Sequence, residues 1–255
     1  MKYIGYFKDL KNRLYTLNII TGGDSSSNKE ITLGDSPFTT EMSSSGKTLY
    51  KSAKYQSATV NIVSDEYYFD MYSSKAHDNR IILYNSKNDI EWTGYLTPNV
   101  YNNSWEGGNQ KMEIEAIDAL STLQYFKYEC VNGSSKDVVS FTSILNKLLS
   151  KCDSYSKFYF SSNTKLTSDS TGSLIDNLFI SEENFYDQMD DKETDEDVAW
   201  DMKNVLEAIC LYMGVTVTAY KDNVYFIDYD AIKNGINTYY EYTINNIGTP
   251  NLVTL

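Results

Sequence analysis

The chain has 255 residues, 41% of them hydrophobic and 14% aromatic, which is enough apolar material for one large or two small folded domains. Its formal net charge of −13 argues against a nucleic-acid-binding protein, because such proteins neutralise phosphates with Lys and Arg. With 3 Pro and 13 Gly it is not collagen-like, and no apolar run approaches the roughly 18 residues of a membrane-spanning helix. We therefore expect no membrane span and no nucleic-acid partner.

The first half of the chain alternates apolar and polar residues at the period of a β-strand. This pattern predicts strands at 1–7, 14–20, 58–63, 80–85, 90–96 and 111–116. The two strands at 80–85 and 90–96 are joined by the turn sequence SKND, which predicts an antiparallel hairpin. Residues 22–29 and 39–47 are rich in Ser and Gly and predict loops.

The second half changes character and predicts two amphipathic helices, the first at about 137–150. Apolar residues recur there at helical spacing from Phe141 to Leu148. Ser140 and Asp137 are both available as the N-cap.

The second helix is predicted at about 195–213. Thr194 and Asp197 resemble a capping box at its start, and Gly214 stands where a C-terminal glycine belongs. Its apolar stripe comprises Val198, Met202, Val205, Leu206, Ile209 and Met213. A second hairpin at 215–219 and 224–229 and a last strand at 238–244 follow.

Strands and helices do not alternate as they would in a parallel doubly wound fold. We therefore predict an α+β, mainly β protein of two small β-barrel-like domains with antiparallel hairpins. The predicted domains are 1–128, rich in β-strands, and 129–255, a helix-loop-helix-hairpin domain whose last strand is free to return to the first.

The residues that catalysis would need are scarce. The single histidine, His77, lies in a polar loop and is more typical of a solvated surface residue than of a triad member. The sequence Gly46-Lys47-Thr48 ends like a phosphate loop, but Glu41 occupies the position of the first glycine. Asp169 begins the sequence DSTG, a faint match to an aspartic-protease motif without a second copy.

The cysteines give no better site. Cys130, Cys152 and Cys210 are odd in number and widely spaced, so we expect them to be reduced, with Cys210 in the core. The sequence therefore predicts no catalytic, cofactor-binding or metal-binding residue and no cofactor, and the protein is not expected to be an enzyme. A hydrolase built on Asp169 or on the acids of 182–201 remains an alternative.

Segment 182–201 holds most of the excess negative charge. Asp191, Glu193, Asp195 and Asp197 alternate as Ca²⁺ ligands can, but an EF-hand would need Gly at Glu196. Three interpretations stay open: a solvated helix start, a weak Ca²⁺ site of another geometry, and a surface that docks onto a basic partner.

Tyrosine is unusually frequent, with 23 residues against 10 Phe and 3 Trp. Most tyrosines are expected to fill the sheets, where aromatic residues are favoured. Exposed ones, together with Trp105 in the loop sequence NNSWEGGNQ, would suit contacts with proteins or glycans. This gives an alternative function, a soluble glycan- or protein-binding module that uses exposed Tyr and Trp.

One arrangement of residues is more informative than any single motif. Residues 92–98 (WTGYLTP), a loop, the strand 112–116 and the sequence AIDALSTL at 116–123 follow one another. This order resembles the strand "W-x-G-x-L-x-P", loop, strand and "A-x-D-x-L-x-x-L" of bacteriophage tail hub and tail-tip proteins, which contractile injection systems share. The helix that includes 205–209 and the hairpin after Gly214 are similar to the later part of that family.

The resemblance implies a structural ring subunit and not an enzyme. Such a subunit, typically one of three in a hub of β-barrel-like domains, joins the tail tube to the spike, the fibres or the tape-measure protein. It would be made in the cytoplasm of a bacterial host and function in the virion tail of a phage or prophage. Gly94 is expected to allow close strand packing, Trp92 to fill the core, and Asp118 to cap the following turn. The chain is also expected to be the N-terminal portion of a longer protein.

Overall fold

The fold is taken from a computed structural model of the chain. The structure describes residues 1–22, 26–43, 50–98, 108–164, 172–187 and 198–255. Strands dominate this part of the chain and the helices are few and short, which confirms the α+β, mainly β class.

The chain forms two compact units. The first comprises Met1–Ser44, Tyr55–Thr122 and Tyr220–Asp222, and the second comprises Ser45–Lys54, Leu123–Ala219 and Asn223–Leu255. The predicted domain ranges 1–128 and 129–255 stay a prediction. Residues 45–54 come from the first half of the chain but belong to the second unit. Residues 220–222 come from the second half but belong to the first unit.

The first unit contains one eight-stranded sheet with the order β3-β1-β2-β7-β8-β9-β6-β4. Its strands are β1 (Lys2–Lys8), β2 (Leu14–Ile20), β3 (Asn28–Glu30), β4 (Thr32–Met42), β6 (Gln56–Ser64), β7 (Arg80–Asn85), β8 (Ile90–Leu96) and β9 (Gln110–Asp118). All neighbours pair antiparallel except β1 and β3, and the predicted hairpin of β7 and β8 is confirmed. Two 3-10 turns, η1 (Phe69–Met71) and η2 (Ser121–Tyr125), lie between or after these strands.

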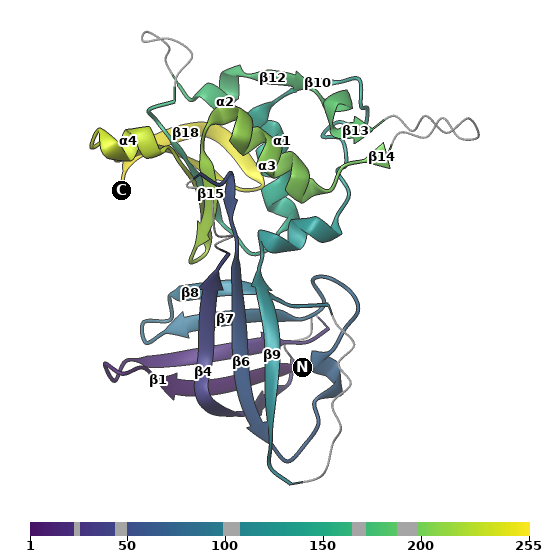
Figure 1. The fold of residues 1–255 in the computed structure, drawn as a ribbon, viewed down its shortest axis with the longest axis vertical. Coiled ribbons are helices and arrows are strands. Elements are labelled where there is room, and N and C mark those ends of the chain that lie inside the picture. Colours follow the sequence, from purple (N-terminus) through teal and green to yellow (C-terminus); the bar gives the residue numbers. More distant parts are fainter. Residues whose placement is uncertain (23–25, 44–49, 99–107, 165–171, 188–197) are drawn as a thin grey trace, which may run out of the picture. The chain divides into compact units, whose positions relative to one another are not determined.

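This sheet is rolled. Its two edge strands, β3 and β4, are separated in the chain only by Ile31, so the edges lie close together. Gly5 of β1 faces the side chain of Leu33 of β4 so closely that a Cβ on Gly5 would lie 2.8 Å from it. In Figure 1, β4, β6 and β9 run across β1, β7 and β8. None of the described sheets closes into a barrel, so the predicted barrel-like detail is not confirmed.

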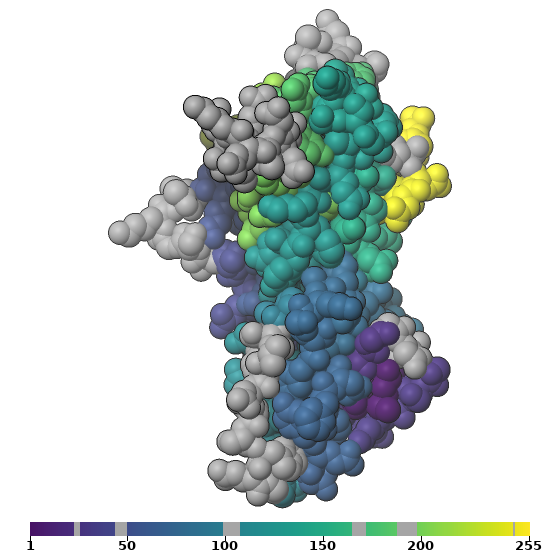
Figure 2. All heavy atoms as spheres, turned by 90° about the vertical axis from the view of Figure 1, so that its right-hand side faces the viewer, coloured from purple at the N-terminus to yellow at the C-terminus, as the bar shows by residue number. Residues whose placement is uncertain are grey.

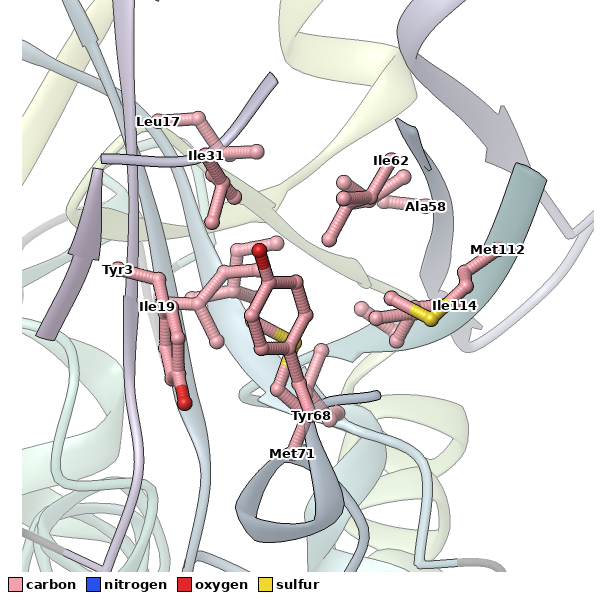
Figure 3. Packing of buried hydrophobic residues seen from close by; sticks show 14 of the residues in the cluster. Tyr3, Leu17, Ile19, Ile31, Ala58, Ile62, Tyr68, Met71, Met112 and Ile114 are labelled. Atoms are coloured by element: carbon pink, nitrogen blue, oxygen red, sulfur yellow. The ribbon is translucent and has the colours of Figure 1, made fainter. Parts of the chain in front are cut away.

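The core of the first unit lies inside this roll. The period-two alternation of the strands places Tyr3, Leu17 and Ile19 against Ile62 and Ile114, and each of these side chains is buried. Figure 3 shows these side chains pointing toward one another, with Tyr68 and Met71 of the η1 segment between them.

The second unit contains a six-stranded sheet with the order β18-β17-β11-β16-β15-β5. Its strands are β5 (Ala53–Lys54), β11 (Lys157–Ser161), β15 (Thr216–Tyr220), β16 (Asn223–Ile227), β17 (Thr238–Thr243) and β18 (Asn246–Thr254). The last predicted strand, 238–244, corresponds to β17, and β18 follows it as an edge strand that the sequence pattern did not predict. β18 pairs with β17 in this unit.

In the described part of the second unit, two small strand pairs and four helices accompany this sheet. The pairs are β10 (Val138–Ser140) with β12 (Phe179–Ser181) and β13 (Tyr186–Asp187) with β14 (Val198–Ala199). The helices are α1 (Phe141–Lys151), α2 (Leu174–Asn177), α3 (Met202–Met213) and α4 (Tyr229–Lys233), and the 3-10 turn is η3 (Glu182–Phe185).

The first predicted helix, 137–150, begins too early. Residues 138–140 form β10, and α1 starts at Phe141 because the backbone before it pairs with β12. Of the two predicted caps, Ser140 is the one used: its Oγ accepts a hydrogen bond from the backbone N–H of Ser143 at 3.2 Å.

The second helix was predicted at 195–213, and of this range the structure describes residues 198–213. Within them the prediction also begins too early. Val198 and Ala199 pair with β13, and α3 starts at Met202. The proposed capping box of Thr194 and Asp197 lies outside the described residues. The predicted C-terminal glycine is confirmed, since Gly214 ends α3 with φ of 67°. Among the described residues, no helix is long and apolar enough to cross a membrane.

Candidate functional site

The W-x-G-x-L-x-P segment and the start of the A-x-D-x-L-x-x-L segment meet in one corner of the first unit, where β8 pairs with the end of β9. Gly94 lies opposite Asp118 in this pairing. A Cβ on Gly94 would overlap the carbonyl oxygen of Ile117 and lie 3.0 Å from Cα of Asp118. No side chain fits there, so glycine is required by the close approach of the two backbones.

Asp118 is the polar centre of this corner, and only 1% of it is exposed. Its Oδ1 accepts hydrogen bonds from the backbone N–H of Ser121 at 2.8 Å and from Ser121 Oγ at 2.6 Å. Its Oδ2 accepts one from the backbone N–H of Gln56 at 2.8 Å. The carboxylate thus caps the turn after β9, as expected, and also fixes the start of β6.

Trp92 completes the corner from inside the sheet. It is 5% exposed, belongs to the core cluster, and its indole lies beside Gly94. Phe38 packs edge-on against it, with ring centroids 5.5 Å apart. The Nε1–H of Trp92 is buried without an acceptor in the described part of the chain. The corner is therefore a packing and capping device with no nucleophile.

His77 is not the solvated residue that its polar loop suggested. Its ring stacks on Tyr95 with centroids 4.1 Å apart, and its Nε2 lies 2.7 Å from Oγ1 of Thr122. Thr122 Oγ1 donates to the carbonyl of Ala119 at 2.6 Å. Because this hydroxyl is buried and committed to the backbone, the pair holds the loop on the unit and does not resemble a nucleophile and its base.

A second buried carboxylate lies in the second unit, and the sequence did not predict its role. Glu182 is fully buried; its Oε1 accepts hydrogen bonds from the hydroxyl of Tyr128 and the backbone N–H of Val131, both at 2.6 Å. Its Oε2 has no partner in the described part of the chain. Burial, followed by the bond to Glu182, raises the pKa of Tyr128 well above its usual range.

Cys130 and Tyr186 border this carboxylate. The Cys130 sulfur lies 3.0 Å from the hydroxyl of Tyr186, and burial raises the pKa of that hydroxyl. Together with Tyr128 and Glu182 these groups form a polar cluster, named here the Glu182 cluster. It joins residues 128–131 to η3 and β13. Its chain-distant members have no shared sequence motif, which is why the sequence pattern missed it.

Cys130, Cys152 and Cys210 all lie in the described part of the chain and form no disulfide there, as expected for the reduced state. Cys210 is fully buried in α3, and burial raises the pKa of its thiol, which makes it a packing residue as predicted. Cys152 is also buried, whereas Cys130 is half-buried.

Several residues that the sequence analysis weighed as possible sites lie outside the described residues: Gly46, Lys47, Thr48, Trp105, Asp169 and six acids of segment 182–201, namely Asp190, Asp191, Glu193, Asp195, Glu196 and Asp197. The three interpretations of segment 182–201, including the weak Ca²⁺ site, therefore stay open. Where the structure is described, no three His, Cys, Asp or Glu side chains come together as metal ligands.

The tyrosines divide between the sheets and the surface. Tyr3, Tyr68 and Tyr242 are among those buried, whereas Tyr6 and Tyr212 are among those exposed. The buried tyrosines thus pack in the core, as expected, and the exposed ones leave ring surface that a partner can contact. No known protein family, no curated protein and no solved structure matches the chain.

Proposed function

We propose that this protein is a structural ring subunit of a phage or prophage tail. In this proposal it has two barrel-like domains and no catalytic activity, and it joins the tail tube to the spike, the fibres or the tape-measure protein. It would assemble as a trimer in the virion tail after synthesis in the cytoplasm of the bacterial host.

The corner of Gly94 and Asp118 is the observation that carries the proposal. The segment order that resembles tail hub proteins is made of aromatic, glycine and apolar positions, which have meaning only if they build a structure. Here Gly94 admits the backbone of β9, Trp92 fills the core, and Asp118 caps the following turn. These three residues have architectural roles of the kind that the resemblance implies, which supports the proposal.

The edge strand β18 offers a surface for assembly. It carries no charged side chain, and Leu252 is 61% exposed. The backbone N–H of Leu255 donates to the carbonyl oxygen of Asn237. Because N–H groups alternate in direction along a strand, those of Val253 and Asn251 also point toward β17. Leu252 and Thr254 therefore direct their N–H groups to the open side, where another chain can pair with them. The strand lies at the surface of its unit (yellow in Figure 2).

Light scattering coupled to size-exclusion chromatography tests this proposal. A mass of three chains that persists on dilution and at moderate salt is expected. Electron microscopy of the same fraction should show closed threefold rings. A monomer at every concentration would contradict the ring assignment.

The edge strand provides a matched pair of variants. Leu252→Pro removes an outward N–H, as Pro250 already does two residues earlier, and should dissociate the ring while the fold survives. Val253→Pro removes an N–H that faces β17 and should instead lower the thermal stability of the chain. If Leu252→Pro leaves the trimer intact, β18 is not the assembly edge.

A further inference from the structure

A pocket of about 390 Å³ opens at one end of the rolled sheet, and every residue that lines it belongs to the first unit. Phe7 near the end of β1, Tyr15 near the start of β2, Phe38 of β4 and Trp92 of β8 bring aromatic rings to it. Its volume falls in the range of roughly 300–1,000 Å³ that is typical of small-molecule sites. The ring role proposed above makes no use of it.

The aromatic rings of the pocket are fixed by their neighbours. Phe7 and Tyr15 are cross-strand partners, and their rings stack 5.4 Å apart at an interplanar angle of 17°. Phe38 is held edge-on against the buried Trp92. Phe7, Tyr15 and Phe38 pack against the core and are still half-buried, so each keeps part of its ring surface at the pocket. The rings are ordered before any ligand arrives, and the Arg13 guanidinium lies over that of Tyr15, with its Cζ 5.9 Å from the ring centroid.

The acids of the pocket already have partners. Asp9 accepts hydrogen bonds from the backbone N–H groups of Lys11 and Arg13, both at 2.9 Å, and from Nε of Arg13 at 2.7 Å. Glu91 accepts one from Asn85 at 2.7 Å and forms an ion pair at 3.2 Å with Lys221 of the same unit. The charge of each carboxylate is thus offset. Both oxygens of Asp9 are fully used, since Oδ2 also pairs with the second guanidinium nitrogen of Arg13, whereas both contacts of Glu91 fall on Oε1 and leave its Oε2 able to accept a ligand hydroxyl.

We propose that this pocket binds a neutral saccharide, with the C–H face of a pyranose ring on the aromatic side chains of Phe7 and Tyr15 and a hydroxyl on Oε2 of Glu91. Flat rings beside hydrogen-bonding groups suit a ligand that is apolar on one face and polar at its rim. The proposal goes beyond the ring role and does not depend on it.

Other ligand classes fit less well. An ammonium or guanidinium group could lie on the rings, but it would compete with Arg13 and Lys221 for carboxylates that are already paired. An anion would meet two carboxylates at the pocket. A neutral polyhydroxyl ligand meets neither obstacle.

Titration of the full chain with neutral oligosaccharides of glucose, galactose and N-acetylglucosamine tests the proposal. Isothermal calorimetry should show one site per chain for at least one of them, with an affinity that does not change with salt. Saturation-transfer NMR should place the pyranose ring protons at the protein surface. Failure of all three sugars to bind would overturn the proposal.

Variants of Tyr15 and Phe69 locate the site. Tyr15→Ala should weaken binding by roughly tenfold, which corresponds to about 1.4 kcal/mol, whereas Tyr15→Phe should bind nearly as the parent does because the ring remains. Phe69→Ala serves as the matched control, since Phe69 is an aromatic residue of the first unit that is 79% exposed and does not line the pocket.

Two further outcomes would count against the proposal. Saccharide binding that survives both Tyr15→Ala and Phe38→Ala would assign the site elsewhere. Binding of tetramethylammonium that falls with salt, without saccharide binding, would make the pocket a cation site. Circular dichroism and urea unfolding of each variant separate a lost contact from a lost fold.

Discussion

Within the described residues, each of the two units buries one carboxylate, and the two carboxylates are satisfied to different degrees. Asp118 in the first unit has partners on both oxygens and is surrounded by three N–H and O–H donors. Glu182 in the second unit uses one oxygen for two short bonds and leaves the other without a partner in the described chain. A saturated carboxylate fixes a fold, whereas one with a free oxygen costs stability unless something compensates it.

The largest effect is expected at the corner that Asp118 shares with Gly94. In Gly94→Ala the new methyl group overlaps the carbonyl oxygen of Ile117, and backbone cannot move aside as a flexible side chain can. We expect a loss of about 3 kcal/mol or more in the free energy of unfolding, or failure of the first unit to fold. Urea denaturation followed by circular dichroism measures it. Gly248→Ala is the comparison for the effect of a methyl group without overlap, since no atom lies near the added Cβ and the backbone is not in the left-handed region.

The next effect tests the saturation of Asp118. In Asp118→Asn the side chain keeps its shape, but its amide –NH₂ must face either the donors of Ser121 or the N–H of Gln56. Two donors then oppose each other in a buried site, which should cost about 1–3 kcal/mol. Thermal and urea unfolding measure the loss. Stability equal to that of the parent would show that the three bonds are not formed together in solution.

Asp118 and Glu182 also show what could and could not be predicted from the sequence. Asp118 caps a turn whose N–H is three residues away, so a local pattern was sufficient, as it was for Ser140 and Gly214. Glu182 meets Tyr128 and Val131 across 54 and 51 residues, and no local pattern encodes such a contact. The aromatic pocket is also assembled from several strands and had no signal of its own.

The errors in the secondary structure have a related cause. Val138 and Val198 lie at helical spacing from the apolar residues of the helices that follow them. Their backbones pair instead with strands β12 and β13, so long-range strand pairing prevailed over the local helical pattern. The strand β18 contains Asn, Gly and Pro, which disfavour a strand by propensity, and it forms because β17 offers a ladder. The mainly β class and most of the central strands follow from local patterns and were predicted, whereas β4 was not, and its residues 39–42 lie where a loop was predicted.

A pH-dependent effect of intermediate size is expected from Tyr128. Its pKa is raised in the folded protein, so its contribution to stability is complete below the unfolded tyrosine pKa of about 10 and is lost as the pH rises beyond that value. Tyr3 and Tyr242 have raised pKa values for the same reason, burial, and add to the effect.

The measurement is urea unfolding at neutral pH and above the ordinary tyrosine pKa. The parent should lose stability steeply in the alkaline range, and Tyr128→Phe should lose less because one ionising group has been removed. Tyr212→Phe is the control, since Tyr212 is 73% exposed and should leave the alkaline slope unchanged. Equal slopes for the parent and Tyr128→Phe would mean that Tyr128 is accessible to solvent.

The smallest effect is expected for Glu182→Gln, and it is the sharpest test of the comparison. The amide oxygen of Gln can accept both bonds that Glu182 Oε1 now accepts, from Tyr128 and Val131, and the –NH₂ replaces an oxygen that has no partner. No existing bond is lost, so the change in the free energy of unfolding should stay within about 1 kcal/mol, less than for Asp118→Asn. Glu182→Ala removes the acceptor of both bonds and should cost about 2 kcal/mol or more. If Glu182→Gln proved as costly as Asp118→Asn, Oε2 would have to bind a group in solution, a water or a cation, and the two carboxylates would be equally satisfied.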